Sequence, residues 1–231
     1  MTDCIQFGKR QIQYTLEYTQ RKTLGITVTP EMEVLVKAPA HASPEEVKER
    51  VRKKALWIIK QQSYFLTFQP RTPERKFVSG ETHLYLGRQY QLKIIQGSAE
   101  IVTIRGPHIE VITPDKRKAR KLLTSWYLER ARQKFHEIAQ PLITRFRKYN
   151  VFPSAIVLRN MSRRWGSCTP GGKIILNPEL IKAPRACIEY VITHELCHLV
   201  HRDHTKQFFD LQTKEMEHWE KWKMVLEKLL A

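Results

Sequence analysis

The N-terminal part of the chain alternates apolar and polar residues with a period of two. The alternation runs through residues 12–18, through 24–28 and again through 34–36. A period of two is typical of strands that bury one face against a core. Because these runs follow one another closely, the pattern predicts an antiparallel meander over the first forty residues.

A helical pattern replaces the alternation at Ser43. Ser43 is a suitable N-cap, Pro44 fits the first helical position, and Glu46 stands where a capping box requires an acid. Apolar residues then recur at helical spacing to about Tyr64. One helix is therefore predicted here, with a partly apolar side and strongly basic ones.

Short apolar runs return beyond residue 80, and turns that contain glycine separate them. Their composition and length indicate strands. The predicted strands are residues 83–86, 89–95, 100–105 and 109–112. The N-terminal half of the chain is thus expected to be mostly β with one helix. No internal repeat is evident in the sequence.

Helical patterns dominate the remainder of the chain. A long helix is predicted from Thr113 to about Asn150, with a kink at Pro141. Two strands are predicted at 155–158 and 173–176, and we expect them to form a small antiparallel sheet of the hairpin type. Further helices are expected at 184–201 and 205–230. The predicted fold class is α+β, with a mostly-β N-terminal domain over residues 1–112 and a helical domain over 113–231.

The most informative motif is the string His194-Glu195-Leu196-Cys197-His198. Residues four apart on a helix lie one turn apart on the same face, so His194 and His198 can bind one Zn²⁺ together. Glu195 lies next to such a site and can act as the general base on the water that zinc activates. The alternative interpretation is a core helix with hydrogen-bonded histidines. Two histidines with an acid between them and a third nearby favour the metal site.

A catalytic zinc ion usually has three protein ligands, and the chain offers three sources for the third. His204 has the spacing of an HExxHxxGxxH pattern, although His201 replaces its glycine. His201 itself is the second candidate, but its place on the same helix makes joint ligation with His194 awkward. We favour His204. The third source is a glutamate of the last helix: Glu215, Glu217 or Glu220.

Several stretches of the sequence resemble the YgjP-like metallopeptidases, which are related to the SprT-like and WLM zinc peptidases. The resemblance is dense from about Met161 to Phe209 and weaker in the N-terminal half. The stretches that carry it are Arg164-Trp165-Gly166-Ser167-Cys168, Ile174-Ile175-Leu176-Asn177-Pro178, Tyr190-Val191-Ile192-Thr193 with the histidine motif that follows, His204 and Phe208, and the weaker Val78-Ser79-Gly80-Glu81 and Tyr85-Leu86-Gly87-Arg88.

This resemblance implies a zincin-like catalytic domain in the C-terminal part of the chain. It implies zinc ligands at His194, His198 and His204 and a general base at Glu195. The predicted cofactor is therefore Zn²⁺, and the predicted substrate is a peptide or protein. An additional donor would stabilise the oxyanion of the reaction, and Arg164, His201 and Tyr190 are the candidates.

The 231 residues carry a formal net charge of +17, with 40 basic and 23 acidic side chains. Such an excess is typical of proteins that meet polyanions, although a basic surface also keeps a protein soluble. The basic segments 48–60 and 116–121 therefore support an alternative function as a nucleic-acid-associated protein, including a protease of DNA- or RNA-bound proteins. A structural zinc site without catalysis is a third hypothesis, which the acid at Glu195 disfavours.

Other features of the composition bear on the compartment. The sequence contains no apolar run long enough for a membrane span and no signal peptide at its start. Four cysteines without a paired CxxC spacing suggest reduced, mostly buried thiols that do not bind the metal. A cytoplasmic protein without a membrane partner is expected.

Overall fold

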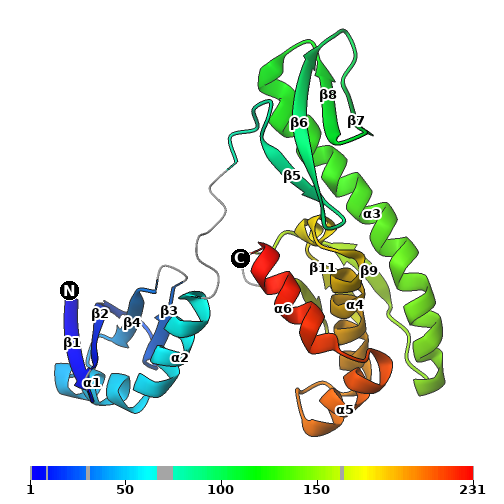
Figure 1. Ribbon diagram of the computed structural model, residues 1–231. Coiled ribbons are helices and arrows are strands. Elements are labelled where there is room, and N and C mark those ends of the chain that lie inside the picture. Colours follow the sequence, from blue (N-terminus) through cyan, green and yellow to red (C-terminus); the bar gives the residue numbers. More distant parts are fainter. Residues whose placement is uncertain (1, 9, 30–31, 67–74, 162–163, 231) are drawn as a thin grey trace. The chain divides into compact units, whose positions relative to one another are not determined.

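Two hydrophobic cores divide the chain into two units (Figure 1). The first core gathers buried residues between Ile5 and Ile58, and the second gathers those between Tyr85 and Leu226. The corresponding units are Met1–Thr72 and Pro73–Ala231. The computed structural model describes residues 2–8, 10–29, 32–66, 75–161 and 164–230. The predicted boundary between residues 112 and 113 does not coincide with this division and falls inside the second unit.

The first unit contains a four-stranded sheet in the order β1-β2-β4-β3. Its strands are β1 (Thr2–Phe7), β2 (Arg10–Thr19), β3 (Gly25–Val28) and β4 (Val34–Pro39). β1 and β3 run antiparallel to their neighbours, but β2 and β4 are parallel. The predicted antiparallel meander is therefore wrong. Alternation identifies the strands but carries no information about which of them pair.

Two consecutive helices follow the sheet, where one helix was predicted. α1 (Pro44–Lys53) begins with the expected capping box, because Glu46 N–H donates to Ser43 Oγ at 3.2 Å and Ser43 N–H donates to Glu46 Oε2 at 2.8 Å. Lys54 ends α1, and α2 (Ala55–Leu66) starts directly after it. The apolar period continues across this break, so the sequence pattern does not reveal it.

The second unit begins with another four-stranded sheet, in the order β5-β6-β8-β7. The strands are β5 (Thr82–Tyr85), β6 (Arg88–Gln96), β7 (Ile101–Arg105) and β8 (His108–Thr113). Again the outer pairs are antiparallel and the central pair is parallel. Both sheets thus have the same topology, and a helix follows each. The sequence shows no repeat that corresponds to this shared topology.

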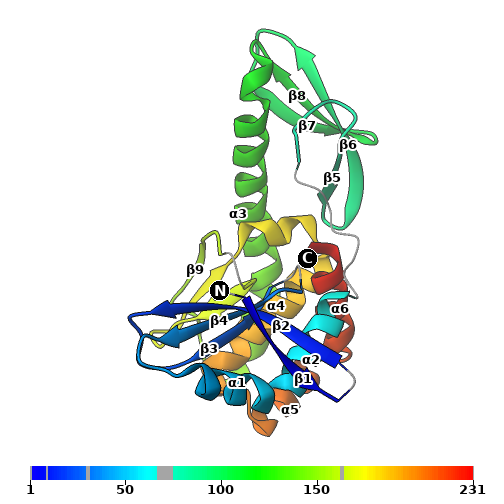
Figure 2. The ribbon, with the colours of Figure 1, turned by 90° about the vertical axis from the view of Figure 1, so that its left-hand side faces the viewer.

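A long helix connects the β5–β8 sheet to the remaining elements of the second unit (Figures 1 and 2). The 3₁₀ turn η1 (Lys116–Lys118) leads into α3 (Ala119–Phe146), and the turn η2 (Arg147–Tyr149) ends it, close to the predicted bounds. α3 contacts β7 and β8 on one stretch and η3 (Pro178–Lys182) and α4 (Arg185–Val200) on another. No helix of the described residues combines the length and apolarity needed to cross a membrane.

A small three-stranded sheet lies beside α4, in the order β10-β11-β9. β9 (Ala155–Leu158) and β11 (Lys173–Leu176) are parallel, and β10 (Gly166–Cys168) runs antiparallel to β11. The predicted antiparallel hairpin of the two longer strands is therefore wrong. The short strand β10, which was not predicted, reverses the chain between them and forms an edge of the sheet.

The last predicted helix is two helices. α5 (Lys206–Glu215) ends before a turn in which His218 has a positive φ of 59°, and α6 (Trp219–Leu230) follows. Both pack against α4. α4 is thus enclosed by α3, α5, α6 and the small sheet, which fixes the helix that carries the histidine motif.

The turn between β5 and β6 also holds the start of α4. Leu86 N–H and Gly87 N–H donate to the carbonyls of Ile181 and Lys182 at 2.9 and 3.0 Å. Gly87 has a φ of +79°, and a Cβ there would lie 2.7 Å from Cγ of Pro184, the N-cap residue of α4. A glycine is required at this turn both by its backbone conformation and by the close approach of Pro184.

The separate core of the first unit yields a prediction. Ile58 is fully buried in α2, whereas Leu56 of the same helix is 72% exposed. Ile58→Ala should lower the free energy of unfolding by about 2–5 kcal/mol, and Leu56→Ala should change it by less than about 0.5 kcal/mol. Denaturant titration measures both. The metal content of the Ile58→Ala chain should stay at the wild-type level, and its loss would contradict the independence of the two cores.

Candidate metal centre

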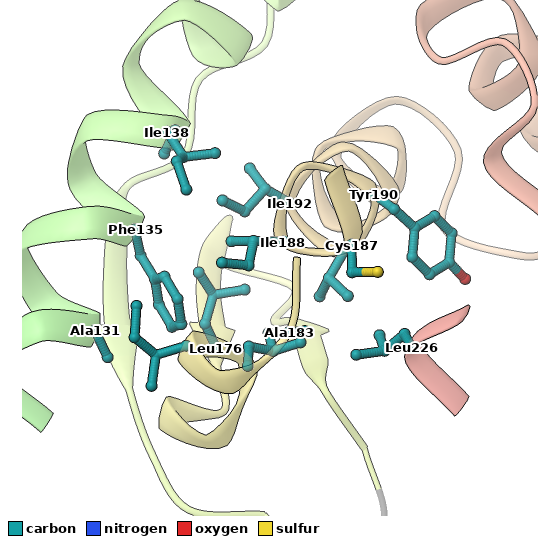
Figure 3. Packing of buried hydrophobic residues seen from close by; sticks show 14 of the residues in the cluster. Ala131, Phe135, Ile138, Leu176, Ala183, Cys187, Ile188, Tyr190, Ile192 and Leu226 are labelled. Carbon is teal, nitrogen blue, oxygen red and sulfur yellow. The ribbon is translucent and has the colours of Figure 1, made fainter. Parts of the chain in front are cut away.

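α4 has one apolar side that anchors it in the core. Figure 3 shows Ile188 and Ile192 of α4 against Phe135 and Ile138 of α3. All four side chains are at most 3% exposed. On the opposite side Tyr190 lies toward α6 and stacks on Trp219, with ring centroids 6.1 Å apart. Packing on several sides leaves the histidines of α4 with little freedom to move.

The three histidines favoured by the sequence come together in the structure. His194 and His198 project from α4, and His204 comes from the segment between α4 and α5. One ligand atom from each lies within 4.8 Å of the others. The Nε2 atoms of His194 and His204 are 3.0 Å apart. Three imidazole nitrogens that converge in this way form a donor set suited to a divalent metal ion.

The turn that delivers His204 requires no glycine. His201, which replaces the glycine of the motif, ends α4 in an extended conformation with φ −127° and ψ 112°. Thr205 then caps α5, accepting a hydrogen bond from Phe208 N–H at 3.4 Å. The extended cap and the new helix start reverse the chain, which brings His204 back to α4.

Phe208 is the surface on which the three imidazole rings rest. Its ring centroid lies 5.0, 4.6 and 4.7 Å from those of His194, His198 and His204, and the side chain is fully buried. An apolar ring in contact with all three histidines restricts their rotamers and excludes water from that side. Phe208 therefore helps to define the shape of the site.

Hydrogen bonds fix two of the rings. His194 Nδ1 lies 2.9 Å from Gln212 Oε1, and His198 Nδ1 lies 3.3 Å from the carbonyl oxygen of His201. Because these oxygens only accept, each Nδ1 carries the proton, and each Nε2 presents its lone pair. Burial lowers the pKa of His194 to about 4, although the bond to Gln212 opposes the change. Neutral imidazole is the form that binds metal.

The other candidates for a third ligand lie elsewhere. Within the described residues, the group of close metal-binding atoms comprises the three histidines above and does not include His201. Glu215 accepts hydrogen bonds from Tyr149 at 2.5 Å and Lys148 at 2.8 Å. Glu217 and Glu220 are also outside the group. The position of Glu215 shows that it supports the packing of α5 on the end of α3.

Glu195 is a buried carboxylate beside the three histidines. Its side chain is 5% exposed, and burial raises its pKa to about 8, against the opposing effects of Arg164 and the Cys168 N–H. Its Oε2 has no hydrogen-bond partner in the described part of the chain. A carboxyl group in such surroundings readily gains and loses a proton. A cation held by the histidines would shift its pKa back toward lower values.

Gly166 explains how Glu195 fits against the edge strand. A Cβ on Gly166 would lie 2.5 Å from Oε1 and 2.9 Å from Cγ of Glu195. Such distances are too short for any side chain, so only glycine allows β10 to approach α4 this closely. The glycine of the RWGSC motif therefore has a steric function at the site.

A cleft of about 510 Å³ opens over these residues. Glu195, His198 and His204 line it together with β10 and the residues that flank β10. Of the three predicted oxyanion donors, Arg164 lines the cleft, whereas His201 and Tyr190 do not. Cys168 also lines it, but burial raises the pKa of the thiol, and nearby Glu195 raises it further, which disfavours a reactive thiolate.

Asn177 braces the backbone next to the cleft. Its side-chain amide donates to the carbonyls of Met161 at 2.9 Å and Arg164 at 3.3 Å, and its Oδ1 accepts from Glu179 N–H at 3.2 Å. The side chain is 4% exposed. These bonds hold the backbone at Met161 and Arg164, on either side of residues 162–163.

Sequence reasoning missed Gln212 and underestimated Phe208. Both lie on α5 four residues apart, so they share one face of that helix. The sequence places both residues in the helix predicted at 205–230, but their contact with His194 depends on the angle between α4 and α5, which the sequence pattern does not give. A polar residue one turn beyond an aromatic one was the available signal.

Comparison with known proteins identifies a family that matches the chain. A family model described as YgjP-like, metallopeptidase domain, matches residues 22–229. Neither the curated proteins nor the solved structures include a match to the chain.

The contact between Gly166 and Glu195 predicts a steric effect. Gly166→Ala should displace Glu195 or β10 and lower the free energy of unfolding by about 1–3 kcal/mol. Gly171→Ala is the matched control, because a Cβ there meets no atom within 4 Å. Chemical denaturation compares the two variants. Equal stability of both would show that the backbone of β10 accommodates a methyl group beside the carboxylate.

Proposed function

The chain belongs to the YgjP-like metallopeptidase family, and from this premise we propose that it hydrolyses peptide bonds with a zinc ion bound by His194, His198 and His204. The observation that carries the proposal is the convergence of three histidine side chains beside a buried carboxyl group. Three ligands leave one coordination position open, as in catalytic zinc sites.

The surroundings of the histidines support this assignment. Gln212 orients His194, and the backbone at His201 orients His198. Such partners of ligating histidines typically raise metal affinity by fixing the tautomer. When bound, zinc would supply a Lewis acid that polarises the peptide carbonyl and makes water more acidic.

Glu195 is the proposed general base and acid. It takes a proton from the attacking water and then delivers this proton to the nitrogen of the departing amine. Its burial against Gly166 holds the carboxylate in one position and keeps bulk solvent away from the proton. Arg164 lines the same cleft and is the proposed donor to the oxyanion.

The substrate is proposed to bind as an extended peptide along β10. Within the described residues β10 pairs with β11 alone, so the backbone groups of its other edge are open to a further strand, except the Cys168 N–H, which donates to Glu195. Addition of a peptide strand at such an edge positions the scissile bond with little dependence on side-chain identity. Peptide binding here would bring the scissile carbonyl over the three histidines.

No specific observation supports the alternative functions. In the basic segment 116–121, Arg117 is paired with Asp115 at 3.1 Å and Lys118 with Glu100 at 2.6 Å. Nucleic-acid binding therefore stays a prediction from charge. A purely structural zinc site would need a fourth protein ligand, and in the described residues the group of close ligand atoms has three.

The proposed ligands can be tested by metal analysis. His204→Ala should sharply lower the zinc bound per chain, because two ligands hold the ion less tightly than three. His201→Ala is the control, since its ring is outside the cluster, and it should keep the wild-type zinc content. Elemental analysis of both purified variants decides the point. Full zinc in His204→Ala would exclude this histidine as a ligand.

The role of Glu195 calls for a separate measurement. Glu195→Gln should keep zinc but lower the rate of peptide hydrolysis by about 100-fold or more, because the amide cannot take up the proton of water. Cleavage of an unstructured protein substrate such as casein measures the rate, and elemental analysis checks the metal. Hydrolysis at the wild-type rate would refute the assignment of the base.

A further inference from the structure

Two arginines give the cleft an unusual charge. The residues that line it include Arg164 and Arg202, and among the described lining residues Glu195 is the acidic one. Arg164 precedes β10, whereas Arg202 lies between α4 and α5, two residues before His204. If Glu195 and Arg164 act on the reacting atoms, the charge of Arg202 has no role in the proposed reaction.

The guanidinium group of Arg202 has no partner within the described residues. No ion pair, side-chain hydrogen bond or ring contact of this side chain occurs there. Neighbouring cations differ, because Lys206 pairs with Asp210 at 2.7 Å and Arg185 with Glu189 at 2.8 Å. Asp203, the next residue, forms no ion pair with Arg202. The charge of this cleft-lining residue is therefore not neutralised within the described part of the chain.

Arg202 is also close to the proposed metal ligands. Its backbone carbonyl accepts a hydrogen bond from the ring of His198, and Arg202 lines the same cleft as His198 and His204. A ligand group bound by Arg202 would therefore sit within a short distance of the scissile bond.

A free guanidinium in a peptide cleft favours a carboxylate. Its planar donors match the two oxygens of a carboxylate, and such charge-assisted bonds are shorter and stronger than neutral ones. A basic substrate side chain at the same place is repelled by Arg202 and Arg164 together. The expected preference for an acid over its amide is roughly 10- to 100-fold.

From this arrangement we infer that Arg202 is a specificity-determining residue that binds a substrate carboxylate beside the scissile peptide bond. The inference rests on the proposed function, because it assumes that the cleft takes a peptide. The carboxylate comes either from an aspartate or glutamate side chain or from the C-terminus of a short peptide. Both sources present the same chemistry, so the experiment must separate them.

The test measures binding to the zinc-loaded Glu195→Gln chain by calorimetry. The probes are alanine pentapeptides, acetylated and amidated at their ends, with Glu or Gln at one position in turn. A further pentapeptide contains alanine alone and has a free C-terminal carboxylate. At one position the Glu peptide should bind about 10-fold or more tightly than the Gln peptide, or the free C-terminus should give that gain instead.

Matched variants connect the preference to Arg202. Arg202→Gln should abolish it, Arg202→Lys should retain part of it, and Lys206→Gln should leave it unchanged. Lys206→Gln removes a nearby charge that is paired with Asp210 and does not line the cleft. Zinc content, measured in each variant, shows whether His204 keeps its position.

Three results would overturn the inference. The first is equal affinity for the Glu and Gln peptides at every position, and the second is that none of the peptides binds. The third is a preference for the acid that survives in Arg202→Gln, since this would mean that the metal binds the carboxylate. Hydrolysis of the same peptides by the wild-type chain is scored separately. Cleavage without an acid preference would remove this inference alone, whereas an Arg202-dependent preference without cleavage would remove the proposed hydrolysis.

Discussion

The close contact between β10 and α4 is the constraint on which the site depends. Gly166 lets the edge strand lie directly against Glu195, so the carboxylate is buried and held in place at the floor of an open cleft. On the other side of α4 the core of the second unit fixes the helix, and the three imidazoles rest on Phe208. The arrangement requires each of these elements, because a loss of packing on either side would change the distance between the carboxylate and the histidines.

Much of the candidate site could be predicted from sequence because it is local. The spacing of His194, Glu195 and His198 places them on one helix, and the apolar positions of the same helix indicate which side is buried. His204 could be proposed from its spacing, but its approach depends on a turn that lacks the usual glycine. Gln212 could not be assigned, since the hydrogen bond to His194 joins two helices whose crossing angle has no local signature.

The fold was harder to predict from the sequence than the site, because strand pairing also depends on residues far apart in the chain. The predicted strand positions agree well with β5 to β8, but the predicted antiparallel pairing was wrong for two parallel pairs, β2 with β4 and β9 with β11. The unit boundary also lay elsewhere, because β7 and β8 pack on α3 and so belong with the helix that follows them. The predicted boundary follows a change in element type along the chain, which marks the end of the β5–β8 sheet.

The shared topology of the two sheets has a consequence for how the chain folds. Segments of equal connectivity can exchange partners during folding, and tandem copies of one arrangement are prone to such misassembly. Here the copies differ in side chains and in turns. Gly87 is fastened to the start of α4, whereas a Cβ on Gly8, in the first turn of the other sheet, would meet no atom within 4 Å. We therefore expect the different turns and side chains of the two sheets to disfavour the exchange of strands between them during folding.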